Sequence, residues 1–201
     1  EMRPGDWSSD VCSSDLYYKQ YRYGWYRICS KILGYSECNL IQVPIYMQFK
    51  LVLNDTFDKY NCGEFDKKEN DTISVSKSNF SHETDEVNVM ISDTYPLSLS
   101  QLPEIKKNIP TLLISRNNTN DVNRYDSPEL VRCVVNEVRS LNNNIKKVNV
   151  YATTNPLNTK NIASSAFKLG GRDNFNEVRV FQQERDGIRK FNNKGIVVYK
   201  R

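Results

Sequence analysis

Polar side chains, most of them small, follow three apolar segments of the sequence, at positions suited to contacting a phosphate group or the edge of a base. These side chains are Ser92, Thr94, Arg116, Thr153, Thr154 and Asn155. Hydroxyl and amide groups donate and accept hydrogen bonds, and free N–H groups of loops and helix ends attract anions. Lys168, farther along the chain, adds positive charge to the same set. Because Ser, Thr and Asn are also common in turns and helix caps, a purely structural role explains these residues equally well.

The sequence lacks the short motifs that carry common catalytic chemistry. It contains no glycine-rich dinucleotide or phosphate loop, no GxSxG and no HExxH. Its single histidine, His82, lies beside Ser81 and Glu83 in a polar stretch, whereas a catalytic triad is assembled across a fold. The cysteines have neither metal-binding spacing nor a histidine nearby. We therefore expect a chain that is not an enzyme, with no catalytic residue, no metal ion and no cofactor.

The elements that would position the polar residues alternate from residue 87 to the end of the chain. Apolar segments predict strands at 87–91, 110–115, 148–151, 177–181 and 195–199, with helices at 98–108, 128–141 and 159–169 between the first four strands. Ser127 followed by Pro128 is typical of a helix start. Such alternation with short connections predicts an α/β fold with a Rossmann-like parallel sheet. In such a sheet ligands bind outside the carboxyl ends of the strands, where the polar residues follow.

The first part of the chain is less regular. Residues 17–34 are aromatic and basic, with a spacing that predicts an amphipathic helix; stacking of its rings on nucleotides is the less favoured alternative. Residues 43–53 fit either a helix with Pro44 in its first turn or a buried strand. Polar residues dominate 58–85, which we interpret as a surface excursion or linker. We assign 17–85 to the remnant of a first lobe plus this linker, and 86–201 to a Rossmann-like second lobe.

One pattern, FKLxxxDxF[DN], occurs at residues 49–58 and again at 167–176. Chance and a true duplication explain so few matches about equally well. A duplication predicts two fused, pseudo-symmetric lobes, the first of them incomplete, that face each other across a cleft.

The first sixteen residues, EMRPGDWSSDVCSSDL, resemble an in-frame translation of a sequencing adapter. We expect residues 1–16 to be non-native and the chain to be the C-terminal part of a longer protein. Without the one arginine and four acidic residues of this segment, the net charge rises from +4 to +7, which favours an anionic partner. No apolar run approaches the roughly 20 residues that span a bilayer, so we expect a cytoplasmic location and no membrane partner.

The second lobe resembles a SAVED domain, the CARF-like nucleotide-sensing module of bacterial CBASS anti-phage effectors. The residues behind this resemblance are Val148–Tyr151 leading to Asn155 and Pro156, then Ala166–Gly170, then Val178–Gln183. The first copy of the repeat departs from the family, because Val52 follows Leu51 where the family has glycine. The resemblance implies two fused Rossmann-like lobes that bind a cyclic oligonucleotide made by a partner cyclase. It further implies ligand-driven homo-oligomerisation and activation of an effector domain fused at the N-terminal side, which is missing from this chain.

Two other functions stay open from the sequence. A Rossmann-like nuclease that degrades cyclic oligonucleotides needs little beyond positioning groups. A basic nucleic-acid-binding module predicts a steep dependence of affinity on salt.

Overall fold

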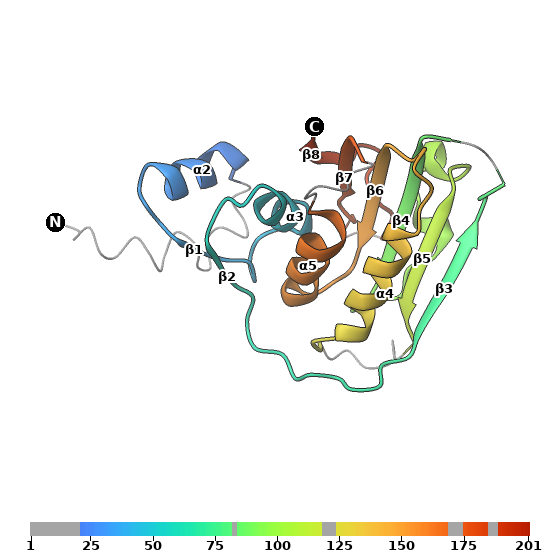
Figure 1. Ribbon diagram of the computed structural model, residues 1–201, viewed down its shortest axis with the longest axis horizontal. Helices are drawn as coiled ribbons and strands as arrows, with labels where there is room; N and C mark the ends of the chain where they lie inside the picture. Colours follow the sequence, from blue (N-terminus) through green and yellow to red (C-terminus); the bar gives the residue numbers. More distant parts are fainter. Residues whose placement is uncertain (1–20, 82–83, 118–123, 169–174, 185–188) are drawn as a thin grey trace.

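The computed structural model describes residues 21–81, 84–117, 124–168, 175–184 and 189–201, and a six-stranded sheet forms the centre of the fold (Figure 1). The strands lie in the order β3-β5-β4-β6-β7-β8. Their bounds are Ile73–Ser78 (β3), Glu86–Ser92 (β4), Thr111–Arg116 (β5), Lys147–Ala152 (β6), Glu177–Phe181 (β7) and Ile196–Lys200 (β8). The four central strands are parallel, and β3 and β8 are antiparallel edge strands. The predicted α/β, Rossmann-like architecture is confirmed, with an antiparallel strand added at each edge.

Side chains of the central strands alternate between two hydrophobic clusters, one on each face of the sheet. Val89 and Val150 belong to the main core, whereas their neighbours Met90 and Tyr151 belong to a smaller cluster. Because successive residues of a strand point to opposite faces, apolar side chains at neighbouring positions indicate that both faces are covered. These strands are therefore mostly apolar in sequence; the buried Asn88 and Asn149, which interrupt β4 and β6, bond to each other across the two strands at 3.0 Å.

Three helices, α3 (Ile45–Leu53), α4 (Pro128–Arg139) and α5 (Pro156–Ile162), lie along one face of the sheet (Figure 1). The start of α4 is as predicted, because the Ser127 side chain accepts the backbone N–H of Leu130. Helix α5 starts earlier than the predicted residue 159, because Asn155 caps it and Pro156 takes its first position. It continues as a π-helical turn over Ala163–Phe167.

Several shorter elements differ from the sequence-based expectation. The helix expected at 98–108 is instead two 3₁₀ turns, Leu99–Gln101 and Glu104–Lys106, separated by Pro103, which has no N–H to continue a helix. Strands β1 (Glu37–Asn39), β2 (Lys59–Asn61) and β3 were not predicted. The aromatic and basic helix is α2, Tyr23–Lys31. No helix in the described part of the chain is long and apolar enough to cross a membrane.

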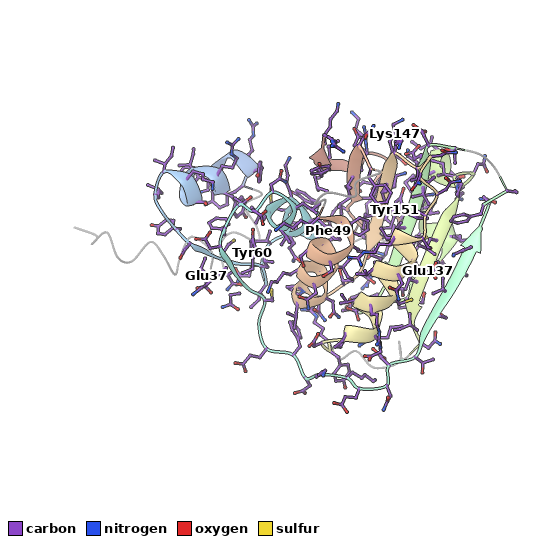
Figure 2. The ribbon with its side chains drawn as sticks, in the orientation of Figure 1. Glu37, Phe49, Tyr60, Glu137, Lys147 and Tyr151 are labelled. Atoms are coloured by element: carbon purple, nitrogen blue, oxygen red, sulfur yellow. The ribbon has the colours of Figure 1, made fainter. Side chains whose placement is uncertain are left out.

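Residues 37–61 form a small strand–helix–strand unit, in which Glu37 and Tyr60 are labelled in Figure 2. Strands β1 and β2 pair in parallel, and α3 connects them. The Tyr60 hydroxyl donates to the Leu51 carbonyl at 2.7 Å, and burial raises the pKa of Tyr60 to about 12. The same order of elements, with the same parallel pairing, occurs in β6-α5-β7.

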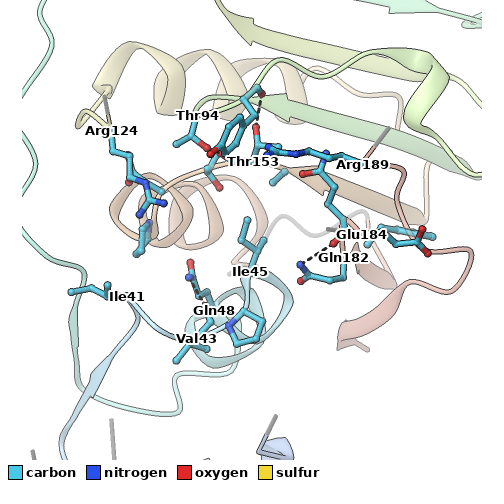
Figure 3. A pocket seen from close by; sticks show the side chains of 18 residues that line it. Ile41, Val43, Ile45, Gln48, Thr94, Arg124, Thr153, Gln182, Glu184 and Arg189 are labelled. Carbon is cyan, nitrogen blue, oxygen red and sulfur yellow. Dashed lines mark hydrogen bonds between the residues drawn. The ribbon is translucent and has the colours of Figure 1, made fainter. Parts of the chain in front are cut away.

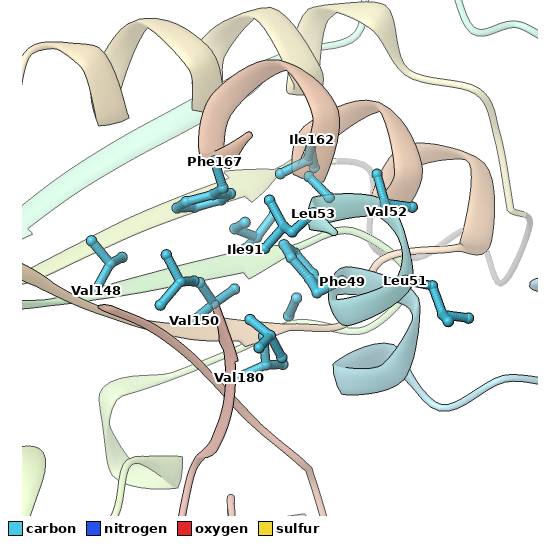
Figure 4. Close-up of a cluster of buried hydrophobic side chains, with 14 of the residues drawn as sticks. Phe49, Leu51, Val52, Leu53, Ile91, Val148, Val150, Ile162, Phe167 and Val180 are labelled. Carbon is cyan, nitrogen blue, oxygen red and sulfur yellow. The ribbon is translucent and has the colours of Figure 1, made fainter. Parts of the chain in front are cut away.

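The two copies of the sequence repeat lie against each other in the core. Phe49 and Phe167, their first residues, are fully buried, and their rings meet edge to face at 5.9 Å between centroids (Figure 4). Lys168 of the second copy pairs with Asp55 of the first at 2.7 Å. The two copies of the pattern thus contact each other, with Phe49 inside α3 and Phe167 at the end of the π-helical turn that follows α5.

Candidate functional site

A cavity of about 480 Å³ lies between the start of α3 and the carboxyl ends of β6 and β7 (Figure 3). Its lining residues are Ile41, Val43, Pro44, Ile45, Gln48, Thr94, Tyr95, Arg124, Ala152, Thr153, Thr154, Asn155, Pro156, Phe181, Gln182, Gln183, Glu184 and Arg189. Ligands of open α/β sheets bind at this edge, outside the carboxyl ends of parallel strands.

Two equivalent loops form opposite walls of this cavity. One runs from β1 into α3 and contributes Val43 and Pro44, and the other runs from β6 into α5 and contributes Asn155 and Pro156. In both units a proline stands at the helix start. The cavity is thus a cleft between the two strand–helix–strand units.

The β1–α3 wall is apolar, and its loop is held from behind. Ile41 remains 44% exposed on the cavity side, beside Val43 and Pro44. The buried Gln48 amide donates to the carbonyls of Leu40 at 3.0 Å and Val43 at 2.7 Å. These bonds fix the loop, so the wall offers a firm apolar surface.

Four of the predicted site residues, Thr94, Thr153, Thr154 and Asn155, line the opposite wall. Their hydroxyls and amides are engaged within the protein. The Thr94 hydroxyl donates to the Thr153 carbonyl, and the Thr153 hydroxyl donates to the Tyr95 carbonyl at 2.8 Å. The Thr154 hydroxyl pairs with that of Thr159 at 2.6 Å. These residues therefore bind the two loops together and shape the wall.

Asn155 connects this wall to α5 and to a neighbouring loop. It is 2% exposed; its side-chain oxygen accepts the N–H of Asn158, and its amide donates to the Tyr125 carbonyl at 2.7 Å. Its backbone N–H donates to the Asp93 carboxylate at 3.3 Å, which also accepts from the Asn158 amide at 2.9 Å. Asn155 is thus held in place through both its side chain and its backbone.

A buried charge cluster lies behind the same wall. Arg116 is fully buried, with its guanidinium 3.3 Å from Asp93 and 3.8 Å from Asp71. Asp71 accepts the Ser127 hydroxyl at 2.7 Å, and the Arg116 guanidinium lies 5.5 Å from the centre of the Tyr125 ring. Burial raises the pKa of Asp93, opposed by the Asn158 hydrogen bond and the Arg116 charge. Arg116, predicted as a ligand residue, lies in this cluster and does not line the cavity.

Two further predicted residues also lie away from the cavity lining. Ser92 is 1% exposed; its hydroxyl donates to the Tyr95 carbonyl at 2.9 Å and accepts the N–H of Leu97 at 3.1 Å. Lys168 pairs with Asp55 at the end of α3. The structure thus brings the β4 and β6 loops together at the cavity and leaves Ser92 and Lys168 outside it.

Sequence reasoning missed the exposed polar groups of the cavity. The Arg189 guanidinium lies 4.4 Å from the centre of the Tyr95 ring, on the same side of the cavity as Gln182 and Glu184, and Arg124 lies on the other side (Figure 3). These residues come from segments far apart in the chain, so no local pattern groups them. The one feature of the sequence that could have located the cavity is the repeat, because a duplication predicts a cleft between two units.

The cavity combines an apolar wall, a rigid polar wall and two exposed arginines. Arg124 and Arg189 suit phosphate groups, since a guanidinium donates paired hydrogen bonds to an anion. In the part of the chain that the structure describes, no group of His, Cys, Asp and Glu residues could hold a metal ion. The arrangement suits binding of an anionic ligand that also carries flat, apolar surfaces.

Comparison with known proteins gives one family match. The family model of the SMODS- and ubiquitin system-associated 2TM effector domain, SUa-2TM, matches residues 11–198. No curated protein matches the chain in sequence.

Solved structures with a similar fold include SAVED/CARF-domain receptors named Cap4 from Acinetobacter baumannii. The receptor with the cyclic trinucleotide 3′3′3′-cAAA superposes with a TM-score of 0.59 at 10% identity, over 92% of this chain and 46% of the receptor. The receptor with 2′3′3′-cAAA gives a TM-score of 0.58 at 12% identity, over 92% of this chain and 45% of the receptor. The chain therefore spans less than half the length of these receptors. The SAVED/CARF fold that the sequence resemblance predicted is confirmed.

Proposed function

The chain belongs to the SUa-2TM family of SMODS- and ubiquitin system-associated effector domains, and from this premise we propose that its cavity binds a cyclic oligonucleotide second messenger. The observation that carries the proposal is the cavity itself, formed between equivalent loops of two similar units. Its volume of about 480 Å³ falls within the usual range of ligand pockets. The similar receptors contain cyclic trinucleotides.

We assign the recognition of phosphates to Arg124 and Arg189 and the contact with a base to the apolar wall around Ile41 and to Tyr95. Ile41 and Tyr95 are 44% and 42% exposed, so each presents surface to a ligand. Thr94 and the loop Thr153–Asn155 hold the opposite wall in place. Binding would then be transmitted to a fused effector domain in anti-phage defence, with self-association of the sensor as the intermediate step.

Isothermal titration calorimetry with cyclic di-, tri- and tetranucleotides tests the proposal. We expect at least one cyclic oligonucleotide to bind the full chain and Arg189→Gln to weaken it by about ten- to a hundredfold, because a hydrogen bond to a charged group contributes about 1.5–3 kcal/mol. Arg132→Gln is the matched control, since Arg132 lies exposed on α4 and outside the cavity.

Three results would contradict the proposal. The first is that none of the cyclic oligonucleotides binds, and the second is that the Arg189 and Arg132 variants bind equally well. The third is that the ligand is recovered cleaved, which would make the chain a nuclease. Salt-steep binding of long linear nucleic acid in place of cyclic ligands would instead indicate the nucleic-acid-binding module.

A further inference from the structure

Helix α2 carries an apolar stripe that the rest of the described chain covers only in part; at its N-terminal end the Trp25 ring stacks with that of Tyr21, with 6.4 Å between the ring centroids. Trp25, Ile28 and Ile32 are spaced by three and four residues, so they lie on one side of the helix and its C-terminal cap. Their exposed fractions are 38%, 38% and 75%, and the next residue, Leu33, is 50% exposed. Tyr26 and Cys29, on a different side, are each only 4% exposed. The stripe is therefore separate from the face that packs on the protein.

Contacts with the end of α3 fix the rotation of α2. The Tyr23 hydroxyl lies 3.2 Å from the Thr56 hydroxyl, and the Ser30 hydroxyl donates to the Thr56 carbonyl. The Lys50 ammonium lies 4.9 Å from the centre of the Tyr23 ring. With these contacts in place, the stripe points outward.

The charged residues of α2 and its N-terminal cap are all positive. Arg22, Arg27 and Lys31 are exposed, and the sequence from residue 17 to residue 36 contains no Asp or Glu. A helix with Trp and aliphatic residues on one side and Arg and Lys beside them is typical of helices that lie in the headgroup region of an anionic bilayer.

We propose that α2 docks on the surface of an anionic lipid bilayer, with Trp25, Ile28, Ile32 and Leu33 inserted at the headgroup boundary. This departs from the expectation of no membrane partner, which rested on the lack of a membrane-spanning run and not on surface docking. A second copy of the chain fits this surface less well. A helix of nine residues is about 14 Å long, far too small to supply the ~800 Å² per partner of a stable interface. Nucleic acid fits less well too, because Ile28, Ile32 and Leu33 neither stack on bases nor donate hydrogen bonds.

Co-sedimentation of the full chain with vesicles tests the proposal. We expect binding to vesicles of phosphatidylcholine and phosphatidylserine, and much weaker binding to phosphatidylcholine alone, since polybasic surfaces respond to anionic lipid. The variant Ile28→Ser/Ile32→Ser should bind at least about tenfold more weakly, because less apolar surface is buried. Ile105→Ser is the matched control, as Ile105 is 72% exposed outside this helix.

A charge variant and a spectroscopic readout keep the test independent of folding effects. Arg27→Gln and Lys31→Gln should each weaken binding about fivefold, whereas Lys194→Gln should not. The chain has two tryptophans, so in a Trp7→Phe background Trp25 alone reports, and its emission should shift to the blue on anionic vesicles.

The proposal fails if the chain ignores anionic vesicles or if the stripe variant binds like the Ile105 control. It fails equally if the stripe variant instead abolishes self-association or binding to single-stranded RNA without any vesicle binding. None of these outcomes depends on the cyclic-oligonucleotide cavity, which the calorimetry tests separately.

Discussion

Asp93 connects the buried charge of the sheet to the loop that forms one wall of the cavity. Its carboxylate accepts hydrogen bonds from the backbone of Asn155 and the amide of Asn158, and it lies 3.3 Å from the guanidinium of Arg116. Buried ion pairs add little net stability, but removing one partner leaves the other without compensation. The role of Asp93 and Arg116 is therefore to hold the wall of the site in place.

We predict that Asp93→Asn destabilises the protein by about 2–4 kcal/mol. Its amide oxygen can take over the hydrogen bonds from Asn155 and Asn158, which share one carboxylate oxygen, but its amide nitrogen then faces the Arg116 guanidinium, donor against donor. The loss should depend on pH. Burial raises the pKa of Asp93 above its ordinary value of 3.8, so the folded state favours the protonated form. The stability that this protonation contributes is full below the ordinary pKa and is lost as the pH rises through the folded pKa.

Urea denaturation of native protein and Asp93→Asn across acidic and neutral pH checks this prediction. The stability difference between the two should narrow as the pH rises above about 4 and then level off. Asp55→Asn serves as the control, since Asp55 is exposed and pairs only at the surface with Lys168. A difference that stays constant with pH, or equal losses in both variants, would contradict this role for Asp93.

At the scale of elements, residues with strong local signals were predicted and those that depend on distant contacts were not. Strand β7 has the predicted bounds, 177–181, and Ser127 marks the start of α4. Strands β1 and β2 have three residues each, too few for a periodic pattern. Strand β3 is a mostly exposed edge strand without an apolar face, so its sequence looks like a linker.

In the candidate site too, residues with a local sequence signal were predicted and residues brought in by distant contacts were not. The loop Thr153–Asn155 was predicted from one topological rule, because polar residues follow a buried parallel strand. The hydroxyls of that loop bond within the protein because the neighbouring loop after β4 approaches it, and the sequence contains no sign of that approach. Arg124 and Arg189 reach the cavity from separate loops, so only the folded chain groups them.

Helix α4 offers a direct test of the packing assignment. Val134 is fully buried against the sheet, whereas its neighbour Val135 is only partly buried. We predict that Val134→Asp costs several kcal/mol, because it buries an unpaired carboxylate. Val135→Asp should cost about 1–2 kcal/mol, the ordinary size of a substitution that water still reaches. Thermal unfolding of both variants measures this, and similar losses would mean that α4 is rotated from the position described.

At the scale of the whole molecule, two strand–helix–strand units meet through Phe49 and Phe167 and leave a cleft at the ends of their strands. Helix α3 packs against α5 and the turn that follows it, and the loops that precede the two helices lie on opposite sides of one cavity. The asymmetry of the walls, apolar at Val43 and Pro44 and polar at Thr153, suits a ligand that presents different chemistry to each side. Both units are needed to close the site, so neither alone should bind.

Hydrogen–deuterium exchange of the full chain, with and without a cyclic trinucleotide, tests this central claim most directly. If the ligand lies between the two units, the exchange of backbone amides in residues 41–48 and in residues 153–158 should slow at the same ligand concentration. The bound ligand would cover both walls and make local unfolding of either loop rarer. Amides of β3 at the far edge of the sheet should exchange unchanged. Protection of only one of the two loops, or protection confined to another part of the chain, would contradict a binding site shared by the two units.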